Sequence, residues 1–124
     1  MAKLLFIQDY LYEYLGPMYI SAILKKEGHD CKMSIGRSIK HFEAAIRSYN
    51  PDIIGFSIMS GSAVWANEVG LKIKKKYGLP TIFGGVNPTF YPEYIKNEGV
   101  DVIVRGEGEE SALEVMNCIE DKKD

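Results

Sequence analysis

The chain alternates short apolar runs with longer segments of helical periodicity, and this alternation constrains its fold more than any other feature. Five apolar runs lie at residues 3–8, 30–35, 52–58, 81–83 and 100–104. Between and after them, apolar residues recur every three or four positions, as on one face of a helix. A chain that alternates strand and helix in this way forms a parallel sheet with right-handed crossovers and helices on both faces.

Residues at the segment borders support the same division. Ser38 suits a helix N-cap, and Asn50-Pro51 ends the helix that follows it. Most of the runs are continuously apolar, as buried parallel strands are, but residues 30–35 alternate and therefore predict an edge strand. We predict an α/β fold with three layers and a doubly wound, five-stranded parallel sheet. Its expected strand order, 2-1-3-4-5, is flavodoxin-like or Rossmann-like.

The bulk properties restrict the class of protein. The 124 residues fit one domain at residues 1–119, followed by a charged tail or linker start at 120–124. A net charge of -2 gives no basic surface for nucleic acid, and no apolar run approaches the roughly 20 residues of a membrane span. Cys31 and Cys118 have no metal-binding spacing, so buried free thiols and a reducing, cytoplasmic location are expected.

The candidate site lies at the carboxyl ends of the strands, where such sheets bind ligands. The segment after the first strand is long and rich in tyrosine, and the one after the third is small and polar. The segment after the fourth opens with two glycines, which either form a tight turn or admit something bulky. The candidate residues are Asp9, Tyr10, Leu11, Tyr12, Gly16, Ser57, Met59, Ser60, Gly84, Gly85, Asn87, Pro88, Thr89, Gly106 and Glu107.

Residue types at these positions argue against three other proteins of related fold. A phosphoacceptor receiver needs an acidic residue after the third strand, where this chain has Ser57 and Met59. A flavodoxin needs a hydroxyl- and glycine-rich phosphate cradle after the first strand, where this chain has tyrosines. A dinucleotide fold needs G-x-G-x-x-G at the same place, and that motif is absent.

Four segments carry a family resemblance. They are LGPMYISAILKKEGHD (15–30), PDIIGFS (51–57), GGVNPT (84–89) and DVIVRGEGE (101–109). In this order and spacing the chain resembles the N-terminal cobalamin-binding domain of cobalamin-dependent radical SAM enzymes. This group includes anaerobic magnesium-protoporphyrin monomethyl ester cyclase-like proteins. The resemblance covers nearly the whole chain, although no single segment is diagnostic.

The resemblance implies a mode of cobalamin binding. The corrin would lie over the carboxyl edge of the sheet, and its nucleotide tail would enter a slot beside the central strands. Ser57 would hydrogen-bond the tail, and Gly84 with Gly85 would leave room for it. Asn87 and Thr89, expected at a helix N-terminus, would meet polar groups of the cofactor.

One departure from the family pattern concerns cobalt ligation. Many cobalamin domains carry D-x-H-x-x-G after the first strand, whose histidine ligates cobalt, and here Leu11 stands in place of that histidine. His29 and His41 are expected at the surface. The sequence therefore predicts cobalamin held base-off without a histidine ligand, with residues 10–15 covering the lower corrin face.

The chain has no C-x3-C-x2-C motif for a [4Fe–4S] cluster. S-adenosylmethionine and the cluster are therefore expected only in a downstream radical SAM domain. The domain itself is interpreted as a binding module without catalytic residues. Two alternatives stay open: a structural or interaction domain that binds no ligand, and a binder of another nucleotide-tailed molecule.

Overall fold

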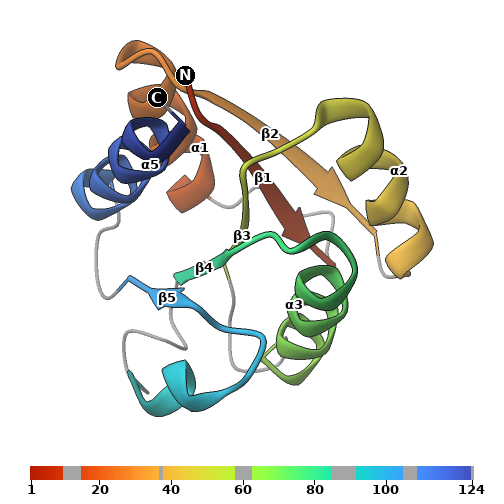
Figure 1. Cartoon of the computed structure of the whole chain (residues 1–124). Helices are drawn as coiled ribbons and strands as arrows, with labels where there is room; N and C mark the ends of the chain where they lie inside the picture. The colour runs from red at the N-terminus through yellow and green to blue at the C-terminus, as the bar shows by residue number, and fades with distance from the viewer. Residues whose placement is uncertain (10–14, 37, 58–62, 85–91, 105–108, 124) are drawn as a thin grey trace.

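Five parallel strands form one twisted sheet in the computed structural model, which describes residues 1–9, 15–36, 38–57, 63–84, 92–104 and 109–123 (Figure 1). The strands are β1 (Lys3–Gln8), β2 (Asp30–Ile35), β3 (Ile53–Ser57), β4 (Thr81–Gly84) and β5 (Val102–Ile103). Their order, β2-β1-β3-β4-β5, confirms the predicted topology. The alternating segment β2 lies at one edge, as its pattern predicts.

Four α-helices are described: α1 (Leu15–Lys26), α2 (Ile39–Tyr49), α3 (Ala63–Tyr77) and α5 (Glu109–Lys123). Ser38 caps α2 by accepting a hydrogen bond from the His41 backbone N–H, and Asn50 ends that helix at a positive φ of 54°. α5 extends through residues 120–123, which the sequence suggests to be a charged tail. Glu120 forms an ion pair with the amino group of Met1, which holds the last turn of the helix against the start of β1.

The region of the expected fourth helix differs from the prediction. Asn87 and Pro88, its expected first residues, lie outside the described residues. The described part is a short 3-10 helix, η2 (Pro92–Lys96). A proline has no backbone N–H and clashes with the preceding helical turn, so Pro92 is incompatible with the interior of an α-helix that begins at residue 87.

The sheet buries a hydrophobic core on each face because side chains of successive residues point to opposite sides. Leu5, Ile54 and Phe56 lie on the face covered by α2 and α3. Leu4 and Phe6 lie on the other face, with Leu24 of α1 and Met116 of α5. Figure 1 shows α1 and α5 together on one side of the sheet, and α2 and α3 on the other.

Aspartate side chains form hydrogen bonds at the amino edge of the sheet, which is the end at which its parallel strands begin. Asp52 Oδ2 accepts a hydrogen bond of 2.8 Å from the Lys3 backbone N–H, and Asp101 Oδ2 accepts one of 2.9 Å from that of Thr81. Asp30 Oδ2 accepts a 2.8 Å hydrogen bond from the Tyr49 hydroxyl. This bond holds the pKa of Asp30 below its ordinary value, because it stabilises the carboxylate. Burial, together with the bond to Asp30, raises the pKa of Tyr49.

Two expectations about single side chains are wrong. His29 is buried, with 3% of its surface exposed, because both of its ring nitrogens are hydrogen-bonded between β1 and α5. Cys118 is exposed, whereas Cys31 is buried as expected and neither forms a disulfide. Cys118 lies on a side of α5 that neither the sheet nor α1 covers. Within the described residues, no helix combines the length and the apolar character that a bilayer span requires.

Candidate functional site

The carboxyl edge of the sheet holds the candidate residues that the structure describes. Asp9 directly follows β1, Gly16 lies in the first turn of α1, and Ser57 and Gly84 are the last residues of β3 and β4. The remaining candidates lie outside the described residues: Tyr10, Leu11, Tyr12, Met59, Ser60, Gly85, Asn87, Pro88, Thr89, Gly106 and Glu107.

Ser57 and Gly84 are neighbours in the sheet. They pair in the register of β3 and β4, so both lie on the same face of the sheet at its carboxyl edge. Gly55, two residues before Ser57, lies on that face as well, together with Ile53 of the core beneath α1 and α5. The two central strands therefore end in small residues on the face that α1 and α5 cover.

Packing within the protein explains Gly55 but not Gly84. A Cβ added to Gly55 would lie 3.0 Å from side-chain carbons of both Leu4 and Phe6, so the glycine lets these two residues pack. Among the described residues, only two atoms would lie within 4 Å of a Cβ added to Gly84, both of Val104 at 3.9 Å, which is ordinary contact. Gly84 has no positive φ either. Within the part of the chain that the structure describes, packing therefore gives no reason for a glycine at this strand end.

Neither histidine lies over the central strands at this edge. His29 precedes β2 at the amino edge, where its Nδ1 accepts a 3.2 Å hydrogen bond from the Ala2 N–H and its Nε2 is 2.8 Å from Asn117 Oδ1. The neutral ring with its proton on Nε2 satisfies both contacts. His41 is exposed in the first turn of α2, with its ring edge-on to that of Phe42. In the described parts of the chain, no three His, Cys, Asp or Glu side chains are placed to hold a metal ion.

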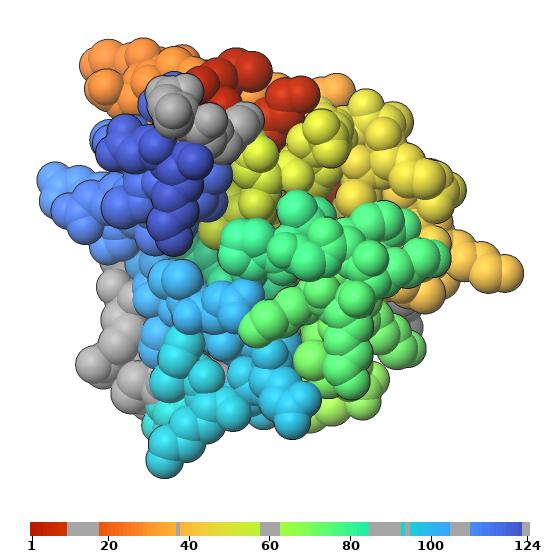
Figure 2. Space-filling model, in the orientation of Figure 1, coloured from red at the N-terminus to blue at the C-terminus, as the bar shows by residue number. Residues whose placement is uncertain are grey.

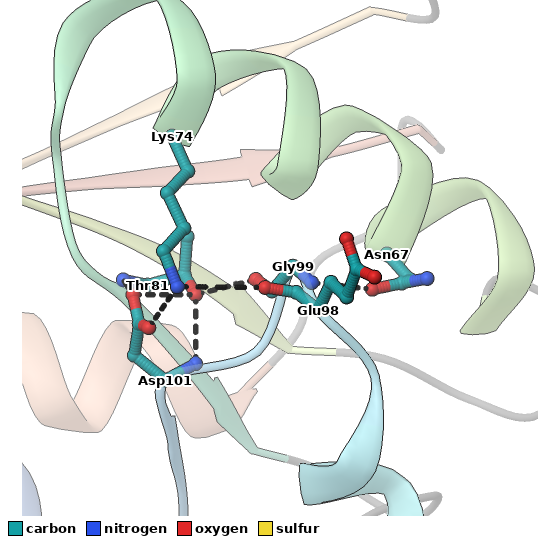
Figure 3. Close-up of polar contacts among 6 residues, drawn as sticks. All are labelled: Asn67, Lys74, Thr81, Glu98, Gly99 and Asp101. Carbon is teal, nitrogen blue, oxygen red and sulfur yellow. Dashed lines mark hydrogen bonds and ion pairs between the residues drawn. The ribbon is translucent and has the colours of Figure 1, made fainter.

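A polar network at the opposite edge joins β4, β5 and α3 (Figure 3). The Thr81 hydroxyl donates a 2.6 Å hydrogen bond to the Gly99 carbonyl, and the Gly99 N–H donates one of 2.9 Å to Asn67 Oδ1. Lys74 forms an ion pair with Asp101. Asp101 is the first residue of the DVIVRGEGE segment, and its contacts stabilise the fold at the amino edge. Its share of the family resemblance therefore concerns the fold and not the proposed cobalamin site.

Sequence reasoning missed this network and the role of Gly55. For Gly55 a signal exists, because a glycine two positions before Ser57 in DIIGFS must lie on the same face of a strand as that serine. For Asn67 the sequence offers no comparable signal. It lies in the middle of a helix, and its partner Gly99 is 32 residues away.

Two curated relatives share sequence with this chain. An anaerobic magnesium-protoporphyrin IX monomethyl ester cyclase from Rubrivivax gelatinosus is 34% identical over 79 residues, which cover 60% of this chain and 14% of the relative. An uncharacterized methyltransferase from Pyrococcus horikoshii is 29% identical over 113 residues, which cover 85% of this chain and 24% of that protein. The chain therefore spans a quarter or less of the length of these relatives.

Solved structures share the fold. The cobalamin-dependent S-adenosylmethionine radical enzyme OxsB, solved with aqua-cobalamin bound, superposes with a TM-score of 0.80 at 19% identity, covering 98% of this chain and 19% of OxsB. The response regulator TrrA from Thermotoga maritima superposes with a TM-score of 0.63 at 19% identity, covering 94% of this chain and 98% of TrrA. Because the fold is shared with receivers, it does not by itself identify the ligand.

Sequence similarity distinguishes a cobalamin-binding domain from a response regulator of the same fold. The model of the B12 binding domain family matches residues 9–116, which begin directly after β1 and include the other four strands and the first half of α5. This match starts at Asp9 and contains every candidate residue of the carboxyl edge. The chain belongs to the B12 binding domain family.

Proposed function

We propose that this domain binds cobalamin at the carboxyl edge of its sheet, with the nucleotide tail beside the ends of β3 and β4. The observation that carries the proposal is Gly84, whose missing side chain is required neither by its backbone conformation nor by packing against the residues that the structure describes. Ser57 lies beside it in the register and would donate or accept a hydrogen bond from the tail. Membership of the B12 binding domain family supports the choice of ligand.

We further infer that the bound cofactor has no histidine ligand from this chain. Leu11 occupies the place of the histidine in D-x-H-x-x-G. His29 is committed to Ala2 and Asn117 at the amino edge, so a role as ligand would require breaking both contacts. The proposed role of residues 10–15 is to cover the lower corrin face with aromatic and aliphatic side chains. Asp9, Gly16, Met59 and the other candidates remain proposed contacts.

When bound, cobalamin supplies a cobalt centre that carries a methyl group or assists a radical step. The residues of this chain would hold and orient it, and none of them is assigned a catalytic role. The similarity to the cyclase and to OxsB supports a parent protein in which a radical SAM domain, with S-adenosylmethionine and a [4Fe–4S] cluster, acts on the cofactor. A cytoplasmic location stays a prediction.

Reconstitution with hydroxocobalamin tests binding. The protein is mixed with the cofactor and desalted, and we expect about one corrin per chain to stay bound with a base-off visible spectrum. Gly84→Val should lower the retained corrin at least about tenfold without lowering the thermal unfolding midpoint, since no described residue closely contacts the position of its Cβ. Ser48→Val, which adds bulk at an exposed position of α2, is the matched control.

Colourless protein after desalting would contradict cobalamin binding and favour a structural or interaction role. Loss of corrin by both variants would contradict the placement at Gly84, because Ser48 lies on the helix layer at the other face of the sheet.

The EPR spectrum of the cobalt(II) form tests the absent histidine ligand. We expect no nitrogen superhyperfine splitting from the protein. His41→Ala provides the discriminating variant, since His41 is the exposed histidine and follows the carboxyl end of β2. A splitting in the unmutated chain that disappears in His41→Ala would show that the inference is wrong and would identify His41 as the ligand.

A further inference from the structure

Gln8, the last residue of β1, places a buried amide in an otherwise apolar layer of the core. Only 4% of its surface is exposed. Leu4 and Phe6 share its face of the strand and belong to the core beneath α1 and α5. An apolar residue at position 8 would continue that layer, and burying an amide costs free energy unless the amide is hydrogen-bonded. The apolar layer therefore does not by itself account for an amide at this position.

Gln8, Ser57 and Gly84 form one row across the carboxyl edge of the sheet. Each is the last residue of its strand and lies on the face that α1 and α5 cover. The row ends in apolar residues on both sides, with Ile35 opposite Gln8 in β2 and Val104 beside Gly84. The two hydrogen-bonding side chains of the row are therefore confined to its centre, next to the glycine at which the nucleotide tail is proposed to lie.

The pairing of β1 with β3 gives a second and independent observation. Among the described residues, its register ends with Phe6 opposite Gly55, although both strands continue for two more positions. Gln8 pairs with β2 at this end, and Ser57 pairs with β4. The strand order reverses between β1 and β3, and open α/β sheets bind ligands in the crevice at such a reversal. Gln8 and Ser57 therefore lie on the two sides of the position at which the topology predicts a ligand.

We propose that Gln8 binds the nucleotide tail of cobalamin together with Ser57, from the opposite side of the crevice. This inference rests on the proposed function and adds a residue of β1 to the site. The amide of Gln8 offers both donor and acceptor groups, and the hydroxyl of Ser57 donates and accepts as well. The phosphate, ribose and base of the tail present complementary acceptors and a hydroxyl. A neutral amide binds such groups without the desolvation cost of a buried charge.

Burial favours the tail over the corrin ring as the group that Gln8 contacts. In the proposed mode the corrin lies over the carboxyl edge, whereas the tail enters beside the central strands. Gln8 is buried and faces the layer beneath α1 and α5, while Asp9, the next residue of the chain, is partly exposed. A contact to the corrin ring therefore suits Asp9 better than Gln8. The contribution of Gln8 should depend on the presence of the tail.

Titration of the whole chain with two corrinoids, followed by visible absorption, tests the proposal. The first is hydroxocobalamin, and the second is cobinamide, a corrinoid that lacks the nucleotide tail. Gln8→Leu should weaken cobalamin binding about tenfold, because a polar group of the tail loses its partner, and should change cobinamide binding by less than about twofold. If neither chain binds cobinamide, the tail supplies the affinity, and loss of cobalamin by folded Gln8→Leu supports the proposal.

Ser34→Ala is the matched control, since Ser34 is also a buried polar residue near this edge but lies opposite Ile7, on the face of α2 and α3. It should bind both corrinoids as the unmutated chain does. Circular dichroism melts establish that each variant is folded, and Gln8→Met replaces the leucine variant if that one unfolds.

The outcomes separate this inference from the proposed function. A folded Gln8 variant that binds cobalamin as tightly as the unmutated chain overturns the role of Gln8 and leaves cobalamin binding standing. Equal weakening of cobalamin and cobinamide also overturns it, because a purely structural role would lower both affinities. An unmutated chain that binds neither corrinoid overturns both proposals.

Discussion

Gly84 and Gly99 lie at opposite edges of the sheet and are expected to respond differently to the same added methyl group. At Gly99 a Cβ would lie 2.4 Å from the Asn67 carbonyl oxygen and 2.8 Å from the Leu71 nitrogen, both backbone atoms of α3. Gly99→Ala should therefore cost about 2–3 kcal/mol of unfolding free energy, as overpacked sites do. Gly84→Ala should change it by less than about 1 kcal/mol. Urea denaturation measures both, and equal losses would contradict this reading of the two positions.

Tyr49 links stability to pH through Asp30. Because the folded pKa of Asp30 is lowered, its contribution is complete above the unfolded value of about 3.9 and is lost as the pH falls through the folded value. Tyr49→Phe should cost about 0.5–1.5 kcal/mol near neutral pH. That cost should shrink when the urea midpoint is measured again near pH 3. Tyr77→Phe, at a partly buried tyrosine of α3, should show no such change with pH.

The two thiols are expected to differ in reactivity. Burial raises the pKa of Cys31 to about 11, so it is a neutral thiol at pH 8 and a poor nucleophile. Cys118 is exposed on α5. Titration of the native protein with a disulfide reagent should therefore modify one thiol per chain quickly, and a second only after unfolding. Cys118→Ser should abolish the fast reaction; a fast reaction that persists would show that Cys31 is accessible.

At the scale of the elements, β5 depends on side chains more than the other strands do. It is two residues long and pairs with Ile82 and Phe83 of β4. Asp101→Ala removes the acceptor of the Thr81 N–H and the partner of Lys74, so hydrogen exchange at the Val104 amide, which bonds to Phe83, should accelerate at least about tenfold.

Asp52→Ala is the matched comparison, because Asp52 makes the same kind of bond to Lys3 beside longer strands. It should leave exchange at Val104 nearly unchanged. Similar acceleration by both variants would indicate that the sheet opens as a unit, and that Asp101 has no special importance for β5.

The elements also show what the sequence can and cannot predict. All five strands were predictable, because four are short apolar runs bounded by turn residues and β2 alternates between apolar and polar residues, as an edge strand does. The fourth helix was not, because Asn87-Pro88 forms a helix-opening pattern although Pro92 interrupts a helix that begins there. The turn between η2 and β5 is bonded to α3 through Gly99 and Asn67, a tertiary contact with no local signature.

At the scale of the whole molecule, the amino and carboxyl edges of the sheet carry different kinds of residues. The amino edge holds the aspartate bonds and the buried His29, and the carboxyl edge holds the small residues Ser57 and Gly84. Topology alone predicts that a ligand site would lie at the carboxyl edge. The loose packing of the described residues around Gly84 could not be predicted, because a glycine in a tighter environment, such as Gly55, serves the core.

A substitution at His29 tests whether the amino edge contributes to stability without affecting the proposed cobalamin site. His29→Ala leaves the Ala2 N–H and the Asn117 amide without their shared partner, which should cost about 1–3 kcal/mol of stability. Since the substitution lies at the amino edge, the retained corrin per folded chain should not change. A visible spectrum and a thermal melt on the same sample measure both; a loss of corrin without unfolding would show that the edges are coupled.

The contact between Met1 and Glu120 brings the first strand and the last helix together at one corner, where Figure 2 shows the red and dark blue ends of the chain side by side. Both ends therefore lie at the amino edge, away from Ser57 and Gly84. Because its two ends lie close together, the domain can be inserted into a surface loop of a host protein, with the proposed cobalamin edge on the side away from the two connections. Circular permutants that join residues 123 and 1 by a short linker should fold for the same reason.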